Sequence, residues 1–242
     1  STNTADAHTA TAADTDTDRD DPAESTRAGS DTTATRTWER LTSDAPVSRI
    51  RETVRRGRDA MRAQILSRLP DDLRGARVLD AGCGTGQMTA ELAARGAEVV
   101  AIDISPALVG IARDRLPIDL RGQVHFASGD MLDPALGRFD HVTAMDSLIY
   151  YAEADIAGAL HGLARRTEGR VVFTVAPRTP LLMAMWRMGQ LFPRNDRSPV
   201  MVPHAPARLS RALGGAGAPG QLAVLERISV GFYISQAMEL AS

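Results

Sequence analysis

The sequence predicts an α/β protein built on a doubly wound, mostly parallel sheet, with helices ahead of the sheet and a helical cap insertion before a C-terminal hairpin. Two observations predict this fold. Apolar segments of strand length alternate with helical segments from Arg74 onward, the order that gives parallel strands joined by right-handed crossovers. The first strand also runs directly into the glycine-rich loop Gly82–Gly86, and open α/β sheets bind ligands at such strand ends.

The pattern of apolar and polar residues predicts where each strand and helix lies. Strands are expected at 77–81, 97–102, 123–128, 139–145 and 170–176, and helices at 87–95, 106–116 and 153–167. Ser105 suits the N-cap of the second helix because Pro106 follows at its first position. At the end of the chain, 221–229 and 230–238 are expected to form a hairpin, with Ser229–Gly231 as its only turn signal.

The N-terminal 35 residues are rich in Thr, Ala and Asp and contain almost no large apolar side chains. Such a segment buries too little surface to offset the entropy lost on ordering, so residues 1–35 are expected to be a disordered tail. We expect residues 36–69 to form an N-terminal helical lid and residues 70–242 to form the main domain.

The lid segment has the pattern of a basic amphipathic helix. Its apolar face is expected to hold Ile50, Val54, Met61, Ile65 and Leu69, and arginines cover the remainder. Three interpretations fit this pattern: the helix packs on the edge of the domain, covers a substrate, or touches a membrane surface.

The glycine loop is typical of a nucleotide cradle. Gly82, Gly84 and Gly86 let the backbone turn tightly, so that a ligand can approach the main chain and the N-terminus of the helix that begins near Gln87. Asp80 precedes the loop, and the third glycine comes one residue earlier than in the G-x-G-x-x-G pattern of dinucleotide-binding proteins. A plain strand-to-helix turn is the alternative interpretation. Cys83 is either a small residue filling this turn or a nucleophile.

A second strand ends in an acid, Asp103, at the spacing expected for a carboxylate that binds ribose hydroxyls. The alternative for Asp103 is a helix cap or a solvated turn. Polar residues also follow the third and fourth strands, so the candidate ligand-binding positions at these three strand ends are Asp103, Ile104, Ser105, Asp130, Met131, Leu132, Met145 and Asp146.

Composition narrows the class of protein. The chain has 242 residues, enough for one α/β domain with additions, and its formal net charge of −2 gives no bulk attraction to nucleic acid. The single cysteine excludes an internal disulfide and fits a reducing cytoplasm. No apolar run reaches the roughly 18 residues that span a bilayer. The histidines show no zinc-like spacing, so no protein metal site is expected.

The insertion at 177–204 contains a Met-rich, largely apolar segment bordered by arginines. A helix that is apolar nearly all round must be covered by protein or by a ligand. Buried packing is one interpretation. The other is a substrate-binding cap for a flat apolar molecule with carboxylates, since methionine adapts to such surfaces and arginine binds carboxylates.

The glycine loop and the acid before it resemble motif I of class I S-adenosylmethionine (SAM) methyltransferases, a Rossmann-like class. Longer stretches resemble one family in this class, the magnesium-protoporphyrin IX O-methyltransferases of chlorophyll and bacteriochlorophyll synthesis. The resemblance covers about residues 33–240 and is carried by Thr35–Leu41, Asp80–Gly86, Asp146–Tyr151, Ala176–Pro180, Leu191–Pro193 and Gly231–Ser235.

The resemblance implies that SAM is the cosubstrate and that the acceptor is a propionate of Mg-protoporphyrin IX. It implies that Asp80, the loop from Gly82 to Gln87 and Asp103 hold the donor, and that the third and fourth strand ends flank its adenine and methyl groups. It also implies a tetrapyrrole as partner, contact with the magnesium-chelating enzyme, and a cytoplasmic protein that is peripheral to the photosynthetic membrane.

We expect Tyr150, Tyr151 and Arg178 to position the acceptor. The tyrosines could instead cap the fourth strand, and Arg178 could pair with a carboxylate of the fold. His204 is a second candidate, as an axial ligand of the porphyrin magnesium. The family pattern has an aromatic pair near Gly29 and Ser30, and His at Tyr150. These departures leave two alternatives: methylation of another hydrophobic molecule, such as a quinone precursor, and a SAM-binding module without turnover.

Overall fold

A computed structural model describes residues 44–180, 183 and 201–241. The chain divides into two compact units, Ser1–Ser48 and Arg49–Ser242, and the fold below is that of the second unit. The expected tail at 1–35 and most of the insertion at 177–204 lie outside the described residues, so the predicted division into tail, lid and capped domain stays a prediction.

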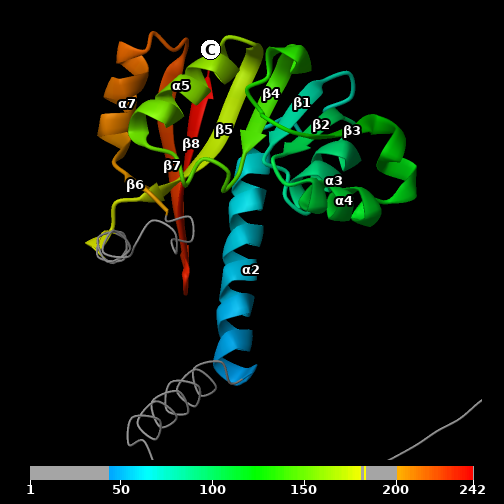
Figure 1. Cartoon of the computed structure of the whole chain (residues 1–242), viewed down its shortest axis with the longest axis horizontal. Helices are drawn as coiled ribbons and strands as arrows, with labels where there is room; N and C mark the ends of the chain where they lie inside the picture. The colour runs from blue at the N-terminus through cyan, green and yellow to red at the C-terminus, as the bar shows by residue number, and fades with distance from the viewer. Residues whose placement is uncertain (1–43, 181–182, 184–200, 242) are drawn as a thin grey trace, which may run out of the picture. The chain divides into compact units, whose positions relative to one another are not determined.

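One sheet organises the second unit (Figure 1). Its strands are β1 (Arg77–Ala81), β2 (Glu98–Asp103), β3 (Val124–Ser128), β4 (Phe139–Ala144), β5 (Thr167–Pro177), β7 (Gln221–Val230) and β8 (Tyr233–Ala241), with the short β6 (Pro203–His204) paired to β5. The spatial order is β3-β2-β1-β4-β5-β8-β7. The first five are parallel to one another, whereas β8 runs antiparallel to both neighbours.

The chain leaves β1 toward β2 on one side and returns on the other side as β4. The strand order thus reverses its direction between β1 and β4, and open α/β sheets bind ligands at the carboxyl ends of the strands at such a switch point. This topology confirms the predicted doubly wound, mostly parallel sheet.

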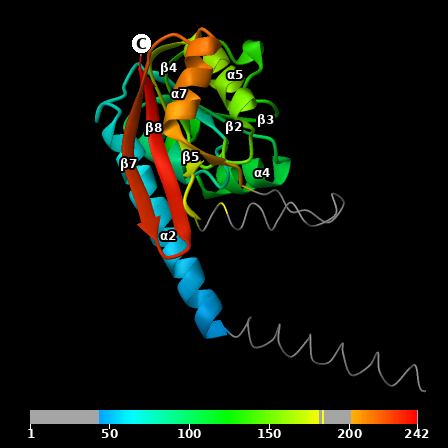
Figure 2. The same ribbon diagram turned by 90° about the vertical axis from the view of Figure 1, so that its left-hand side faces the viewer.

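The helices are α2 (Asp44–Ser67), α3 (Gln87–Ala94), α4 (Pro106–Arg115), α5 (Glu153–Ala164) and α7 (Pro206–Gly215), with short 3-10 turns at Ile118–Gln123 and Pro134–Leu136. The two faces of the sheet carry separate apolar cores. Leu79 and Phe173 pack with residues of α5 and α7, including Leu160 and Leu209. The adjacent residues Val78 and Val172 point the other way and pack with residues of α2, α3 and α4. Figure 2 shows α7 and α2 on opposite sides of β8.

Helix α2 approaches the C-terminal hairpin closely because Gly57 has no side chain. A Cβ at this position would lie 2.5 Å from Cδ1 of Tyr233. Met61 and Ile65 are fully buried, as the predicted apolar face requires, but Ile50 is 37% exposed. At its end the helix is tied to the sheet by Arg68, whose Nε lies 2.7 Å from Oε2 of the buried Glu239.

The structure differs from the sequence prediction most clearly in two boundaries and one missed helix. The hairpin turns at Gly231 and Phe232 rather than at Ser229–Gly231, with Gly231 at a φ of 57°. The strand expected from residue 170 begins at Thr167 and so shortens the preceding helix, which ends at Ala164. Helix α7 was missed, although Pro206 stands at its first turn and its two buried leucines, Leu209 and Leu213, lie four residues apart.

Candidate functional site

The loop after β1 is a backbone cradle. Gly82, Gly84 and Gly86 all have left-handed φ angles, of 82°, 53° and 83°, which side chains rarely tolerate. The amides of Gly82 and Cys83 both donate to the carbonyl of Ile102, at 2.8 and 2.9 Å. A Cβ on Gly82 would lie 2.4 Å from Cβ of Ser147, so glycine also lets the loop pack against the turn that follows β4.

Asp103, the last residue of β2, lies directly beneath this loop. Its Oδ2 accepts a hydrogen bond from the amide of Gly84 and its Oδ1 accepts one from the amide of Ser105, both at 2.9 Å. Each oxygen keeps a lone pair, so the fixed carboxylate can still accept from the two hydroxyls of a sugar diol. The next side chain, Ile104, is 85% exposed, which leaves an apolar surface free for a flat ring. An adenosine therefore fits the cradle.

The turn after β3 and the start of α4 lie next to Asp103 and are held by side-chain hydrogen bonds to the backbone. Oδ1 of Asp130 accepts from the amide of Leu132 at 2.8 Å and so fixes the turn after β3, where Met131 is buried. Ser105 Oγ accepts from the amide of Leu108 at 3.4 Å, the predicted N-cap of α4.

Asp80 lies at the base of the loop and is almost fully buried. It is 1% exposed, and its carboxylate accepts hydrogen bonds from the hydroxyls of Thr89 at 2.6 Å and Thr143 at 3.3 Å. Burial raises the pKa of Asp80 to about 6, and the two threonine hydrogen bonds only partly oppose this. Burial also raises the pKa of the Cys83 thiol. Cys83 is therefore a neutral packing residue and not a nucleophile.

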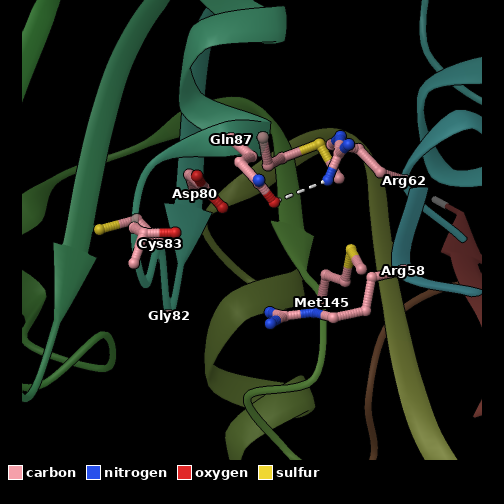
Figure 3. A pocket seen from close by; sticks show the side chains of 9 residues that line it. Arg58, Arg62, Asp80, Gly82, Cys83, Gln87 and Met145 are labelled. Atoms are coloured by element: carbon pink, nitrogen blue, oxygen red, sulfur yellow. Dashed lines mark hydrogen bonds between the residues drawn. The ribbon is translucent and has the colours of Figure 1, made fainter. Parts of the chain in front are cut away.

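A hollow lies between the glycine loop and helix α2 (Figure 3). Asp80, Gly82, Gln87 and Met145 line one side, and two arginines of α2 line the other. Arg62 donates to Oε1 of Gln87 at 3.1 Å, so the helix and the start of α3 are tied together across this hollow. The two guanidinium groups, Arg58 and Arg62, make it suitable for the carboxylate of an amino acid.

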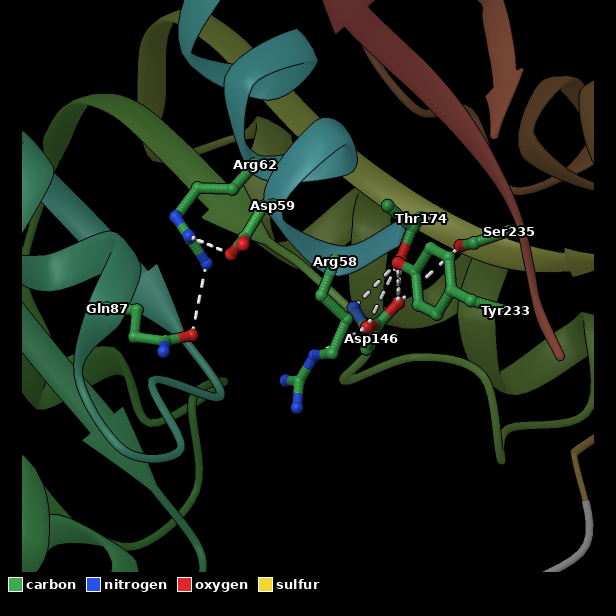
Figure 4. Close-up of polar contacts among 8 residues, drawn as sticks. All are labelled: Arg58, Asp59, Arg62, Gln87, Asp146, Thr174, Tyr233 and Ser235. Atoms are coloured by element: carbon green, nitrogen blue, oxygen red, sulfur yellow. Dashed lines mark hydrogen bonds and ion pairs between the residues drawn. The ribbon is translucent and has the colours of Figure 1, made fainter. Parts of the chain in front are cut away.

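Asp146 follows β4 with a φ of 55°, the only left-handed angle among the described non-glycine residues. Its carboxylate accepts from the hydroxyl of Tyr233 at 3.0 Å and from that of Thr174 at 3.2 Å. Nε of Arg58 lies 3.4 Å from its Oδ2. Figure 4 shows these groups converging on the carboxylate from α2, β5 and β8. Asp146 thus joins three distant segments at the edge of the hollow between the glycine loop and α2.

The acceptor candidates lie near one another. Tyr150 and Tyr151, 49% and 38% exposed, end the loop after β4. The amide of Val202 donates to the carbonyl of Ile149 at 2.8 Å, and the amide of Arg178 donates to the carbonyl of His204 at 3.3 Å. The structure thus connects the tyrosine loop, β6 and Arg178. Arg178 also lines a groove with Met183, Val202, Pro203 and Arg208.

His204 also lines the groove beside Arg178, although it is almost fully buried. Its side chain is 2% exposed, and its Nε2 donates to the carbonyl of Tyr151 at 2.9 Å. Burial lowers the pKa of His204, which keeps the ring neutral. The hydrogen bond occupies Nε2 only, so the axial-ligand role of His204 stays a hypothesis. Within the described part of the chain, no three His, Cys, Asp or Glu side chains gather in a metal-binding group.

Sequence reasoning missed Arg58, Arg62 and Tyr233 as site residues. The arginines belong to a helix with many similar arginines, and only the docking of α2 selects these two. Tyr233 lies in Gly231–Ser235, which carried part of the family resemblance, and this was the one available signal.

This sheet order, with a glycine loop after β1 and a fixed carboxylate after β2, defines a class I SAM-dependent methyltransferase. Comparisons with known proteins narrow the class. A family model described as methyltransferase domain matches residues 78–168, and one described as magnesium-protoporphyrin IX methyltransferase C-terminus matches residues 144–242.

Individual proteins that resemble the chain belong to the same family as the second of these models. The chain is 60% identical over 210 residues to magnesium-protoporphyrin O-methyltransferase of Rhodobacter capsulatus, covering 86% of this chain and 92% of the relative. It is 30% identical to the protein of that name from Synechocystis, covering 84% and 88%. The crystal structure of magnesium protoporphyrin IX methyltransferase from Synechocystis with bound SAH superposes with a TM-score of 0.64 at 28% identity, covering 86% of this chain and 94% of that one. The chain belongs to the magnesium-protoporphyrin O-methyltransferase family.

Among the described helices, none is both long and apolar enough to cross a membrane.

Proposed function

We propose that this protein transfers a methyl group from SAM to one propionate carboxylate of Mg-protoporphyrin IX, giving the monomethyl ester in chlorophyll or bacteriochlorophyll synthesis. The observation that carries the proposal is the Asp103 carboxylate, fixed at 2.9 Å by the amides of Gly84 and Ser105 beside the exposed Ile104, in a chain of this family.

The donor site is assigned residue by residue. Asp103 binds the ribose diol, Ile104 and Met131 flank the adenine, and the turns fixed by Ser105, Asp130 and Leu132 shape that pocket. The glycine loop and Gln87 carry the methionine end. The buried Asp80 attracts the ammonium group, and Arg58 and Arg62 attract the carboxylate. Met145 lies beside the transferred methyl group, held there by Asp146.

The reaction makes few chemical demands on the protein. A propionate has a pKa near that of Glu, about 4.3, and is an anionic nucleophile at neutral pH without a general base. SAM, when bound, supplies an electrophilic methyl group on sulfur. The protein then has to align the carboxylate and exclude water, and alignment alone can contribute roughly 7–11 kcal/mol.

Tyr150, Tyr151 and Arg178 are proposed to position the acceptor carboxylate. The tyrosine hydroxyls can donate hydrogen bonds, and Arg178 can add a charge-assisted one. His204 supports them indirectly, because its ring holds the carbonyl of Tyr151. No resident metal is proposed, since magnesium arrives in the substrate.

The acceptor is poorly soluble, which bears on where the enzyme obtains it. We propose that it acts in the cytoplasm at the surface of the photosynthetic membrane and receives its substrate from the magnesium-chelating enzyme. Phe232 at the hairpin tip is 72% exposed and provides an apolar contact for such a surface. Flotation with anionic vesicles tests membrane contact, and the expected loss of binding in Phe232→Ser assigns it to the hairpin.

Incubation of the purified chain with SAM and Mg-protoporphyrin IX tests the main proposal. Formation of S-adenosylhomocysteine together with a porphyrin methyl ester is expected. Donor binding without product would indicate a SAM-binding module. Turnover with a quinone precursor but not with the porphyrin would instead indicate a methyltransferase for another hydrophobic acceptor.

A further inference from the structure

The hollow between the glycine loop and α2, which is the proposed donor site, is called the donor hollow below. A second groove adjoins it along the exposed side of α2. Two apolar side chains, Ile50 and Val54, and two cationic ones, Arg51 and Arg55, line it on the helix side. The groove and the donor hollow share three lining residues, Arg58, Thr85 and Gln87. The two depressions are therefore adjacent, so a large ligand near the donor lies within reach of the groove.

The groove carries uncompensated positive charge. Arg58 is paired with Asp146, and Asp59, the acidic residue that lines the groove, is paired with Arg62. Arg51 and Arg55 are exposed, and neither has a carboxylate partner within the described residues. Two guanidinium groups beside two aliphatic side chains match an apolar ligand that carries an anion.

The acceptor has a second anion at a suitable place. The two propionates of protoporphyrin lie on neighbouring pyrrole rings, on the same edge of the macrocycle. When one carboxylate reaches the donor methyl group, the other must lie close to the donor hollow. Leaving that carboxylate buried without a cation would weaken binding.

We propose, on the basis of the proposed function, that Arg51 and Arg55 bind the propionate that is not methylated, while Ile50 and Val54 contact the edge of the macrocycle. This arrangement also accounts for a single methylation. A monoester that rebinds in the reversed orientation places its neutral ester against Arg51 and Arg55 and gains no ion pair, so the remaining acid is presented to the donor less often.

The test combines a change in the protein with a change in the substrate. The variant is Arg51→Gln/Arg55→Gln, and the control is Arg49→Gln/Arg56→Gln, which removes two exposed arginines of the same helix that do not line the groove. The acceptors are Mg-protoporphyrin IX and its monoamide, in which the non-reacting propionate is capped. KM for each acceptor, kcat, and Kd for SAM are measured.

For the wild type, capping is expected to raise the acceptor KM about five- to tenfold. The groove variant should show a similarly raised KM for the uncapped acceptor and little further change on capping, with kcat and the SAM Kd unchanged. The control should retain the wild-type response to capping. Arg51→Lys/Arg55→Lys, which keeps the charge, should recover part of the acceptor affinity.

An unchanged acceptor KM in an active groove variant would overturn the inference and leave the proposed function intact. A raised SAM Kd would overturn it too, by assigning the groove to the donor, as would an equal effect in the control. No methyl transfer by the wild type would remove the proposed function and the inference together. If the double variant does not fold, the single Arg55→Gln variant is assessed by the same criteria.

Discussion

Two parts of the proposed site are built in different ways. In the part proposed to hold the adenosine, each group belongs to one strand and the turn that follows it: the glycine loop after β1, Asp103 at the end of β2 and Asp130 after β3. In the part next to helix α2, one carboxylate, that of Asp146, is held by residues from α2, β5 and β8, which are far apart in the sequence.

The difference shows which part of an enzyme a local motif can specify. Hydrogen bonds between Asp103 and the amides of Gly84 and Ser105 follow from the turn itself and form wherever the two strands pair. The contacts of Asp146 require α2 to dock on the C-terminal hairpin. We therefore expect changes that disturb the docking of α2 to impair acceptor use more than they impair binding of the adenosine part of SAM.

The largest effect is expected for Asp103→Ala, on the donor side. The change removes the carboxylate that accepts hydrogen bonds from two sugar hydroxyls. Each of these hydrogen bonds is worth roughly 1.5–3 kcal/mol, so the Kd of SAM should rise by a factor of about 100 or more. Titration calorimetry measures this. The exposed Asp114 on α4 provides the control, since Asp114→Ala should bind SAM like the wild type.

The next effect is a pH dependence that involves Asp80. Because burial raises the pKa of Asp80 to about 6, the carboxylate that attracts the donor ammonium becomes protonated below that pH. SAM affinity should fall about tenfold per pH unit below pH 6. In Asp80→Asn the affinity should be lower at pH 7 and nearly flat from pH 5 to 7. A wild-type affinity independent of pH over this range would contradict the assignment of Asp80.

The raised pKa of Asp80 also makes the free energy of unfolding depend on pH. The pKa of about 6 in the folded state lies above the usual aspartate value of 3.8, so the folded state binds more protons than the unfolded state between these values. The free protein should therefore lose roughly 2–3 kcal/mol of stability as pH rises from 4 to 6. Urea unfolding of the wild type and Asp80→Asn across this range isolates the contribution.

Gly57→Ala tests the docking of α2. The added Cβ would lie 2.5 Å from the Tyr233 ring, and overpacking of this kind costs roughly 1–3 kcal/mol. The thermal midpoint should fall by about 2–8 °C, and the acceptor KM should rise more than the SAM Kd. Gly158→Ala on α5, where a Cβ meets no atom within 4 Å, should be neutral or slightly stabilising.

The smallest effect is expected where one hydrogen bond is removed from Asp146. Tyr233→Phe deletes the 3.0 Å bond from the hydroxyl and should reduce kcat/KM for the acceptor about three- to tenfold, with SAM binding unchanged. Ser235→Ala deletes a longer contact of 3.5 Å and should have a smaller effect. A larger loss for Ser235→Ala than for Tyr233→Phe would show that the hydroxyl of Tyr233 does not hold Asp146.

The sequence was sufficient for the sheet and for the placement of the donor candidates because both depend on local signals. The positive-φ glycines lie within one five-residue turn, and the strand-end acid Asp103 and the cap at Ser105 lie two residues apart. Arg58 could not be distinguished from Arg55 or Arg56, since the distinction arises only when Gly57 docks on Tyr233. The burial of His204 escaped prediction for the same reason, because its partner, Tyr151, lies 53 residues earlier in the chain.

The central claim is methyl transfer to a porphyrin carboxylate, and the most direct measurement is mass spectrometry of Mg-protoporphyrin IX after incubation with trideuteromethyl-labelled SAM. We expect one labelled methyl group per porphyrin, released by mild alkali as an ester should be, and far less label with Asp103→Ala at the same SAM concentration. A porphyrin without label, or a label that resists alkali, would contradict it.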